Sequence, residues 1–352
     1  MRHQGTAEDG EDVMNLEFDA DTEGLISEAA RVFGGAAPVD RLRDGPAPDT
    51  WKALAHAGWT TLGAEIAGGA LDLGAAVGIY REAGRRLLVE QYVTSGYLLP
   101  ALMSQIDGPR EELEARLLAT PGVLLGDGRR RGYEVGPLEH GFCYGIDDLA
   151  SDVYRLNRDD SGRLRLEVLD GGERSMARTG DLSIAVGTVV TNGGSWHSVP
   201  LTIDDAPLEQ LRRNELLLHS AALLGCSEQV LVLTRDHTGG RIQFGVPIGS
   251  FQAVKHALAD VYAANEVAWS ALLCACADEA DRGYRSDVAR LLTVEAALSA
   301  ARVGAQFHGG IGFTWESDLH HYLKTVLDGA YRFGSSDEIA TRIGWTFLDD
   351  AC

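Results

Sequence analysis

The stretch QFHGGIGFTWESDLHHYLK, residues 306–324, decides how the last part of the chain folds. An apolar, alanine-rich segment of helical period runs into it, and Gly309, Gly310 and Gly312 then interrupt that helix. Glycines that stop a helix leave bare backbone amides and carbonyls able to meet a ligand at close range. The sequence therefore predicts a ligand-facing turn between two apolar helices, with Gln306 one turn before the glycines.

This stretch also resembles a known family. Gln-x-His-Gly-Gly-Ile-Gly-Phe-Thr-Trp-Glu, followed by Asp-Leu-His-His-Tyr-Leu-Lys, is similar to the C-terminal flavin-contacting segment of the acyl-CoA dehydrogenase superfamily. The likeness is greatest to the actinobacterial branch that works on bulky acyl chains. The resemblance implies FAD as the cofactor and an acyl-CoA thioester as the substrate class.

Composition indicates an acidic protein of ordinary globular balance. Of its 352 residues 45% are hydrophobic and 24% are charged, and the formal net charge is −21. Such a chain can form more than one domain. Its acidity argues against nucleic acid and anionic membrane surfaces as partners, because a phosphate backbone needs Lys and Arg. No apolar run approaches the ~20 residues that span a bilayer. The polar, acidic N-terminus lacks the features of a signal peptide, so a cytoplasmic location is expected.

Periodicity divides the chain into four parts. Residues 1–20 are expected to be a disordered tail, 21–119 an N-terminal helical domain, 120–206 a small central antiparallel β domain, and 207–352 a C-terminal helical bundle. The predicted class is therefore α+β. The order helices, sheet, helices is that of the acyl-CoA dehydrogenase fold, with its four-helix bundle, so the resemblance extends over most of the chain.

Individual elements follow from the same patterns. Apolar spacing predicts helices over residues 73–88, 92–103 and 211–235, and a further helix that ends near residue 279. Short runs rich in Val, Ile, Tyr and Phe predict the strands, and Asp159-Asp-Ser-Gly162 predicts a hairpin turn between two of them.

A second motif begins at Arg241, Arg-Ile-Gln-Phe-Gly-Val-Pro-Ile-Gly-Ser-Phe-Gln. It resembles the signature Arg-x-Gln-Phe-Gly-x-Pro-Ile-x-x-Phe-Gln of the same superfamily. Arg241 supplies the cation that a pyrophosphate requires. Gln243 can hydrogen-bond a ribityl or phosphate oxygen, and Phe244 can cover an aromatic ring. The alternative is an ordinary turn between helices, whose arginine pairs with a carboxylate.

The resemblance implies an unequal flavin site. In the family, this turn and the equivalents of Gln306, Gly309 and Gly310 touch the flavin bound to the neighbouring subunit. A chain's own flavin is held mainly by a Thr-Glu-Pro-x-Ala-Gly-Ser-Asp-like strand and a Trp-Ile-Thr-Asn-Gly-like strand. Neither occurs within residues 120–205, where residues 191–194 keep only a trace of the second. The sequence retains the half of the site that serves a partner.

The candidate catalytic base is Glu215. Desaturation needs a carboxylate to take the α-proton of the thioester while a hydride leaves the β-carbon for the flavin. Most relatives place a Glu before Gly-Thr near the C-terminus, but the corresponding stretch here is Arg332-Phe-Gly-Ser-Ser336. A minority use a Glu on the first helix of the bundle, close to the position of Glu215. Burial would suit it to act as a base; the interpretation favoured at this point is a first-turn carboxylate stabilised by the helix dipole.

Three hypotheses follow. The first is a subunit of a heteromeric acyl-CoA dehydrogenase, in which this chain pairs with a paralogous, fully equipped subunit as a heterotetramer. The model for it is the actinobacterial steroid side-chain enzyme type. The second is a homo-oligomeric enzyme of the same fold in specialised metabolism, with or without redox chemistry. The third is a structural partner that stabilises another dehydrogenase. No histidine or cysteine spacing indicates a metal site.

Overall fold

A computed structural model gives the structure of the chain. It describes residues 17–36, 48–88, 90–106, 108, 110–119, 122–124, 140–144, 152–178, 186–192, 194–277, 281–314 and 316–349.

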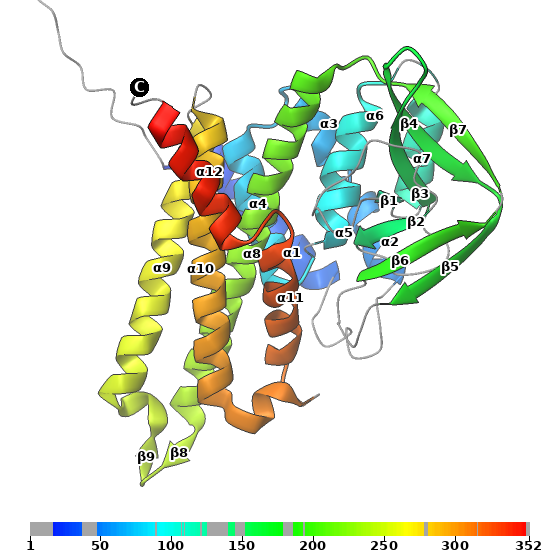
Figure 1. Cartoon of the computed structure of the whole chain (residues 1–352). Helices are drawn as coiled ribbons and strands as arrows, with labels where there is room; N and C mark the ends of the chain where they lie inside the picture. Colours follow the sequence, from blue (N-terminus) through cyan, green and yellow to red (C-terminus); the bar gives the residue numbers. More distant parts are fainter. Residues whose placement is uncertain are drawn as a thin grey trace, which may run out of the picture.

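Helices form both ends of the chain, and two sheets lie between them in sequence (Figure 1). The N-terminal helices are α1 (Ala20–Ala36), α2 (Pro48–His56), α3 (Leu62–Ala67), α4 (Leu73–Arg85), α5 (Glu90–Val93), α6 (Leu99–Met103) and α7 (Arg110–Ala119). A π-helical segment, η2 (Thr94–Leu98), joins α5 to α6 without a break. The helix predicted over residues 92–103 is therefore present, with one wide turn inside it.

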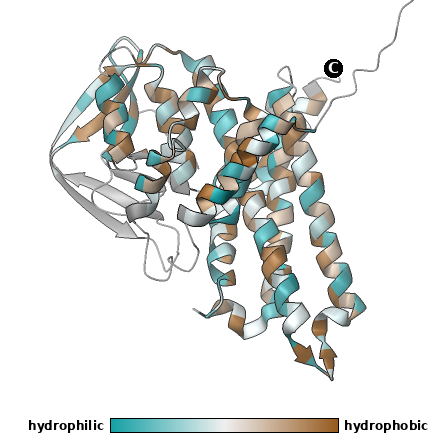
Figure 2. Ribbon diagram, turned by 180° about the vertical axis from the view of Figure 1, so that it is seen from behind, coloured by the Kyte–Doolittle hydropathy of each residue, from teal (hydrophilic) through white to brown (hydrophobic). Residues whose placement is uncertain are grey.

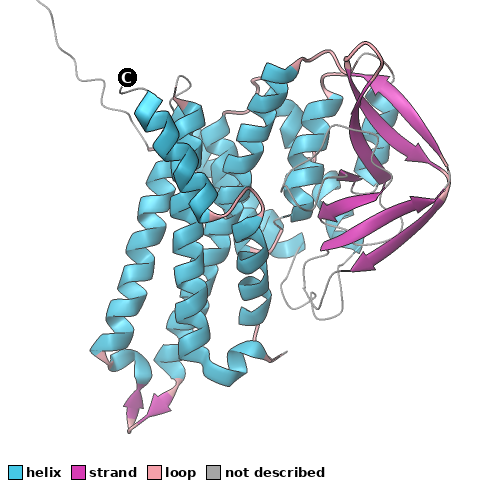
Figure 3. Ribbon diagram, in the orientation of Figure 1, coloured by secondary structure: helices cyan, strands magenta, loops and turns pink. Residues whose placement is uncertain are grey.

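The strands form two sheets at one side of the molecule (Figure 3). They are β1 (Gly122–Leu124), β2 (His140–Tyr144), β3 (Asp152–Arg158), β4 (Leu164–Asp170), β5 (Glu173–Arg178), β6 (Val186–Asn192) and β7 (Ser195–Pro200). One sheet has the order β1-β3-β4-β7 and the other β2-β6-β5. Every pair in them is antiparallel except β1 with β3, so the expected antiparallel β domain is present, with one parallel pair at this edge.

The predicted hairpin turn joins β3 to β4. Asp159 Oδ1 accepts hydrogen bonds from the backbone amides of Ser161 and Arg163, at 3.0 and 3.1 Å. Gly162 has φ +83°, a value that favours glycine. The turn fixes the register in which Tyr154 faces Val168 and Leu156 faces Leu166.

The C-terminal bundle is built around one long helix, α8 (Asp205–Gly240). The other helices are α9 (Gln252–Ala277), α10 (Arg282–His308), α11 (Leu319–Tyr331) and α12 (Ser336–Asp349). A small hairpin, β8 (Ile242–Gln243) with β9 (Val246–Pro247), and the 3-10 turn η3 (Ile248–Ser250) join α8 to α9. A second 3-10 turn, η4 (Gly309–Phe313), follows α10.

Helix α8 is long and apolar enough to cross a membrane, but 67% of its most apolar window lies buried inside the protein. It packs against α4, α9, α10 and α11, which explains its apolar character as that of a core helix. One buried cluster extends from Ala29 of α1 through Tyr154 of β3 to Ala296 of α10. The N-terminal helices, the first sheet and the bundle therefore share a core.

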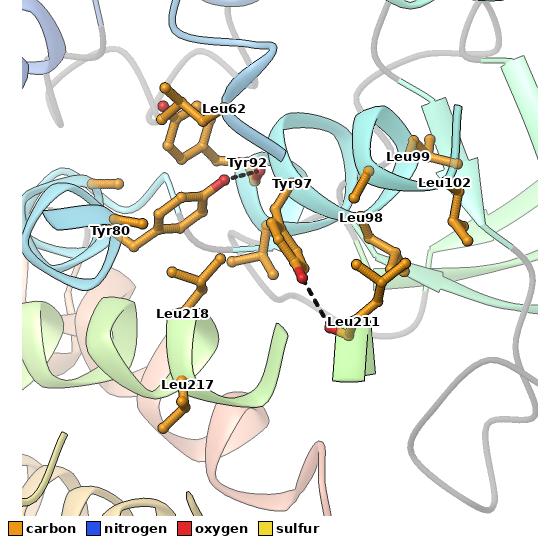
Figure 4. Close-up of a cluster of buried hydrophobic side chains, with 14 of the residues drawn as sticks. Leu62, Tyr80, Tyr92, Tyr97, Leu98, Leu99, Leu102, Leu211, Leu217 and Leu218 are labelled. Carbon is orange, nitrogen blue, oxygen red and sulfur yellow. Dashed lines mark hydrogen bonds between the residues drawn. The ribbon is translucent and has the colours of Figure 1, made fainter. Parts of the chain in front are cut away.

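Three buried tyrosines join the N-terminal helices to α8 (Figure 4). The rings of Tyr80 and Tyr92 stack with centroids 4.8 Å apart. The Tyr97 hydroxyl donates to the backbone oxygen of Leu211 at 3.1 Å. Burying an aromatic ring of this size contributes about 1.5–3 kcal/mol, and the hydrogen bonds satisfy the polar ends.

Helices α4 and α8 touch backbone to backbone through two glycines. A Cβ atom at Gly84 would lie 1.8 Å from the carbonyl oxygen of Ala222, and one at Gly225 would lie 2.0 Å from that of Arg81. Any side chain at either position would force the helices apart. The crossing therefore fixes the N-terminal helices tightly onto the bundle.

The α+β class is confirmed. The residue boundaries proposed between the four parts stay predictions. The strand expected near residues 132–136 and most of the predicted N-terminal tail lie outside the described residues.

Candidate functional site

The hairpin after α8 carries an aromatic side chain in a strained conformation. Gln243 pairs with Val246, which leaves Phe244 and Gly245 as a two-residue loop with φ of +53° and +79°. Such loops favour Asn-Gly, because a bulky residue at positive φ is strained. Phe244 is nonetheless 93% exposed. A strained, exposed phenyl group is more readily explained by a binding role than by folding.

Arg241 begins this turn and points its charge outward. Its backbone N–H caps α8 by donating to the carbonyl of His237 at 2.9 Å. Its side chain is exposed and makes no ion pair with any carboxylate of the described residues. The predicted alternative, an ordinary turn whose arginine pairs with a carboxylate, therefore lacks its partner there. Gln243 is exposed too, with its amide donating to the backbone oxygen of Ile242 at 2.8 Å.

The glycine motif forms a second open turn. Helix α10 ends at His308, and Gly309 follows with φ +62°. A Cβ atom at Gly309 or Gly310 would meet no other atom within 4 Å, so the backbone there is open to an approaching group. Gln306 is exposed on the last turn of α10.

Both turns lie at the same end of the bundle, the lower end in Figure 1. His237 of α8 and His308 of α10 join them, because their rings stack with centroids 4.2 Å apart. The predicted residues Arg241, Gln243, Phe244, Gln306, Gly309 and Gly310 are hereafter called the tip surface. Figure 2 shows the hairpin strands at this end coloured as hydrophobic, and Ile242 is 62% exposed.

Glu215 belongs to a different region. Helix α8 begins at Asp205, so Glu215 lies well inside it, and the favoured interpretation as a first-turn carboxylate was wrong. The side chain is 2% exposed, and its Oε1 lies 3.4 Å from Nη2 of Arg332. Arg332 follows α11 and is itself buried. The sequence placed Arg332 in the stretch that lacks the usual Glu, but it gave no sign of this ion pair.

A second arginine lies beside that pair. Arg290 is fully buried and donates to the carbonyl of Gly329, and its Nη1 lies 3.2 Å from Nδ1 of His219. Burial lowers the pKa of both Arg290 and Arg332 to about 9. Phe333 lies against both guanidinium groups, 5.3 and 5.7 Å from its ring centroid. Glu215, His219, Arg290, Arg332 and Phe333 are hereafter called the buried centre.

The buried centre borders a cavity of about 820 Å³. Glu215 and Phe333 line its inner side, Leu216 and Trp345 add apolar wall, and arginines 212, 213 and 342 also line it. Arg212 pairs with Glu209 and Arg342 pairs with Asp287, so the lining combines an apolar wall with paired charges. Sequence reasoning missed this cavity, because its walls come from α8, α10 and α12.

The tip surface fits part of a flavin dinucleotide. An exposed guanidinium without a carboxylate partner matches a pyrophosphate, the exposed phenyl group can cover a ring, and open glycine backbone permits close approach. These groups stand on a protruding end, which suits a cofactor seated mainly on another subunit. No three His, Cys, Asp or Glu side chains of the described ranges gather as a metal site.

Comparison with known proteins gives a consistent family. Residues 210–343 match the family described as "Acyl-CoA dehydrogenase, C-terminal domain". The acyl-CoA dehydrogenase IpdE2 of Mycobacterium tuberculosis is 40% identical over 127 residues, which is 36% of this chain and 39% of that protein. The acyl-CoA dehydrogenase FadE27 of the same organism is 24% identical over 87% of this chain and 90% of its own length. The IpdE2 match thus spans about two fifths of that relative.

Solved structures show the same fold over nearly the whole chain. The ChsE4-ChsE5 complex from Mycobacterium tuberculosis aligns with a TM-score of 0.76 at 21% identity, covering 95% of this chain and 99% of the matched chain. A Tcur3481-Tcur3483 steroid ACAD variant aligns with a TM-score of 0.70 at 22% identity, covering 94% and 98%.

Proposed function

We propose that the chain is a member of the acyl-CoA dehydrogenase superfamily and forms one subunit of a heteromeric, FAD-dependent acyl-CoA dehydrogenase. The reaction would be the α,β-desaturation of a bulky acyl thioester of steroid or polyketide type. The partner would be a paralogous subunit, in a cytoplasmic heterotetramer. FAD, when bound, supplies the hydride acceptor.

The tip surface is the observation that carries this proposal. An arginine with no carboxylate partner among the described residues, a strained exposed phenylalanine and two open glycines stand together at one end of the bundle. Packing within this chain does not account for the combination. In an assembly, Arg241 would bind the pyrophosphate, Gln243 would orient it, and Gly309 and Gly310 would let the cofactor approach.

Two further observations support a partner with its own flavin. The central strands lack the sequence motifs with which family members hold their own isoalloxazine. Two of the solved structures that share this fold are of pairs of differently named chains, ChsE4 with ChsE5 and Tcur3481 with Tcur3483. The second of these is named a steroid enzyme, which favours a bulky acyl substrate.

The buried centre favours a second candidate function. Glu215 opens onto a cavity large enough for an acyl group, so a homo-oligomeric enzyme could use it as the base. Arg332 already engages that carboxylate, however, and a base must be free to meet the α-carbon. Glu215→Gln in the assembled enzyme separates the two. A base would lose about 10²–10⁴-fold in turnover with flavin content unchanged.

The tip proposal is tested on the complex co-purified with a paralogous partner. Arg241→Ala should remove a charge-assisted contact and weaken flavin binding roughly tenfold to hundredfold. The matched control is Arg235→Ala, because Arg235 is exposed on the same helix and pairs with Asp236 instead. Flavin content and dissociation are measured by absorbance. Unchanged retention in Arg241→Ala, or full flavin occupancy of this chain alone, would overturn the proposal.

A further inference from the structure

We infer that the stacked pair His237–His308 is a positioning element that sets the relative placement of the two turns of the tip surface. In this inference neither imidazole contacts the flavin itself. The inference rests on the proposed function in one respect, since its effect on flavin presumes that the tip surface grips the cofactor.

The stack joins the last turn of α8 to the last residue of α10. The rings lie 4.2 Å apart with an interplanar angle of 21°. His308 is 5% exposed, and its Nδ1 lies 3.0 Å from the carbonyl oxygen of Gly304. Because a carbonyl can only accept, Nδ1 is the protonated nitrogen, and this bond fixes the plane of the ring.

Helices α8 and α10 are closely packed beside the stacked histidines. One turn before His308, a Cβ atom at Gly304 would lie 2.8 Å from Val230 of α8. One turn after it, a Cβ atom at Gly312 would lie 2.9 Å from Cβ of His308 itself. The glycine turn is thus folded directly onto the ring that meets α8.

The other ring is coupled to the arginine turn through backbone. The carbonyl of His237 accepts from the amide of Arg241 at 2.9 Å, and the carbonyl of Arg241 accepts from the amide of Ile248 at 2.9 Å. Gly249 packs against Thr238, with its Cβ position 3.2 Å from that residue's carbonyl oxygen. A shift of His237 would therefore be passed to both ends of the Arg241 turn.

The charge state of the pair suits a stack. Burial lowers the pKa of both histidines, and the nearby Arg241 lowers the pKa of His237 further. Both rings are therefore neutral at neutral pH and can stack without repulsion. Among the described residues nothing hydrogen-bonds the buried Nε2 atom of His237, a cost that the stack must offset.

The first test is made on the full-length chain without flavin. His237→Ala should speed hydrogen exchange of the amides of Arg241 and Ile248 severalfold, and that of Thr314 in the glycine turn, because both turns lose their common support. His237→Phe keeps a ring that can stack and should restore slow exchange. His56→Ala, at an exposed histidine of α2, is the control. Unchanged exchange in His237→Ala would overturn the inference, whatever the fate of the flavin.

The second test is made on the co-purified complex. His237→Ala should weaken flavin retention about five- to twentyfold, and His237→Phe should recover most of it. Combined with Arg241→Ala, the histidine variant should add less than its effect alone, since part of that effect acts through the arginine. Full additivity in the double variant would show an independent role and contradict the inference. If Arg241→Ala alone leaves flavin retention unchanged, the proposed function fails instead, and the exchange experiment still decides the role of the stack.

Discussion

The two ends of helix α8 differ in how their charged residues are accommodated. Near its start Glu215 is buried and pairs with Arg332, and near its end Arg241 is exposed with no carboxylate partner among the described residues. The first arrangement compensates a charge inside the protein. The second leaves a charge available to something outside it. The contrast indicates that the tip surface, rather than the buried centre, is shaped by a group this chain does not itself contain.

The same contrast appears in the aromatic residues. Phe333 lies between two guanidinium groups and borders the cavity, in an ordinary backbone conformation. Phe244 has positive φ and almost full exposure. Packing explains the first ring, whereas the second carries a conformational cost and has only an edge contact with the exposed Phe251, their ring centroids 6.3 Å apart. On the proposed function, stability and binding belong to different ends of α8.

The largest expected effect breaks the buried centre. Glu215→Ala leaves Arg332 charged and uncompensated, and should lower the free energy of unfolding by about 3–5 kcal/mol. Glu215→Leu combined with Arg332→Met should restore most of this loss, because both charges are removed and volume is kept. Glu114→Ala, which breaks an exposed pair with Arg110, should cost less than about 1 kcal/mol. Denaturant unfolding measures all three. An equal loss of unfolding free energy in Glu215→Ala and Glu114→Ala would show that the buried pair contributes no more to stability than an exposed one.

Acidification should act next most strongly, through the same region. Burial lowers the pKa of His219 well below its usual value, and Arg290 beside it lowers it further. Below about pH 6.5 the unfolded chain binds a proton at His219 and the folded chain does not. The free energy of unfolding should therefore fall with pH from about 6.5 downward, by up to about 1.4 kcal/mol per pH unit for this group.

His219→Gln isolates that contribution. Its unfolding free energy should depend less steeply on pH between 6.5 and 5.5 than that of the natural chain. His56→Gln, at an exposed histidine of α2, is the matched control. Identical slopes for His219→Gln and the natural chain would show that the buried ring titrates alike in both states.

The smallest expected effect concerns the strained Phe244 of the tip surface. Phe244→Asn places a residue that tolerates positive φ in the hairpin loop, and should stabilise the isolated chain by about 1 kcal/mol. Phe251→Asn, at an exposed ring with φ −73°, should give no such gain. The complex of Phe244→Asn should retain flavin less well. A variant that gained stability and lost no flavin would mean that the strained phenyl group serves another purpose.

The order of elements was predictable because it depends on local pattern. Apolar spacing of 3.6 residues marked α8, although the prediction began at residue 211 and the helix begins at Asp205. The polar first turns carry no apolar stripe, and Pro207 is tolerated only near a helix start. That misplaced start is also why Glu215 was taken for a first-turn residue.

The elements that were missed depend on distant partners. Strand β5 reads ERSMAR, without alternation, and it lies at the edge of its sheet beside β6. The parallel pairing of β1 with β3 joins segments separated by the whole of β2. Nothing local in either segment specifies such neighbours.

The candidate site divides in the same way. The tip residues belong to two motifs with strong turn chemistry, and the structure places both at one end of the bundle. Their role in flavin binding stays a prediction. The pairing of Glu215 with Arg332 spans 117 positions, and the stack of His237 on His308 joins separate helices. Contacts between residues on separate helices depend on how the helices pack, and no fixed sequence spacing predicts them.

The glycine crossing of α4 on α8 bears on how the chain is made. Gly84 of α4 must meet Ala222 of α8, and Arg81 must meet Gly225, both of which are synthesised much later. At ribosomal speeds of about 5–20 residues per second, the interval is about 7–28 s. During that time the early helices have no α8 to cover them, and their apolar faces are open to chaperones or aggregation. We expect slowed translation beyond residue 225 to help little, whereas faster translation of the preceding segment should raise the yield of soluble protein.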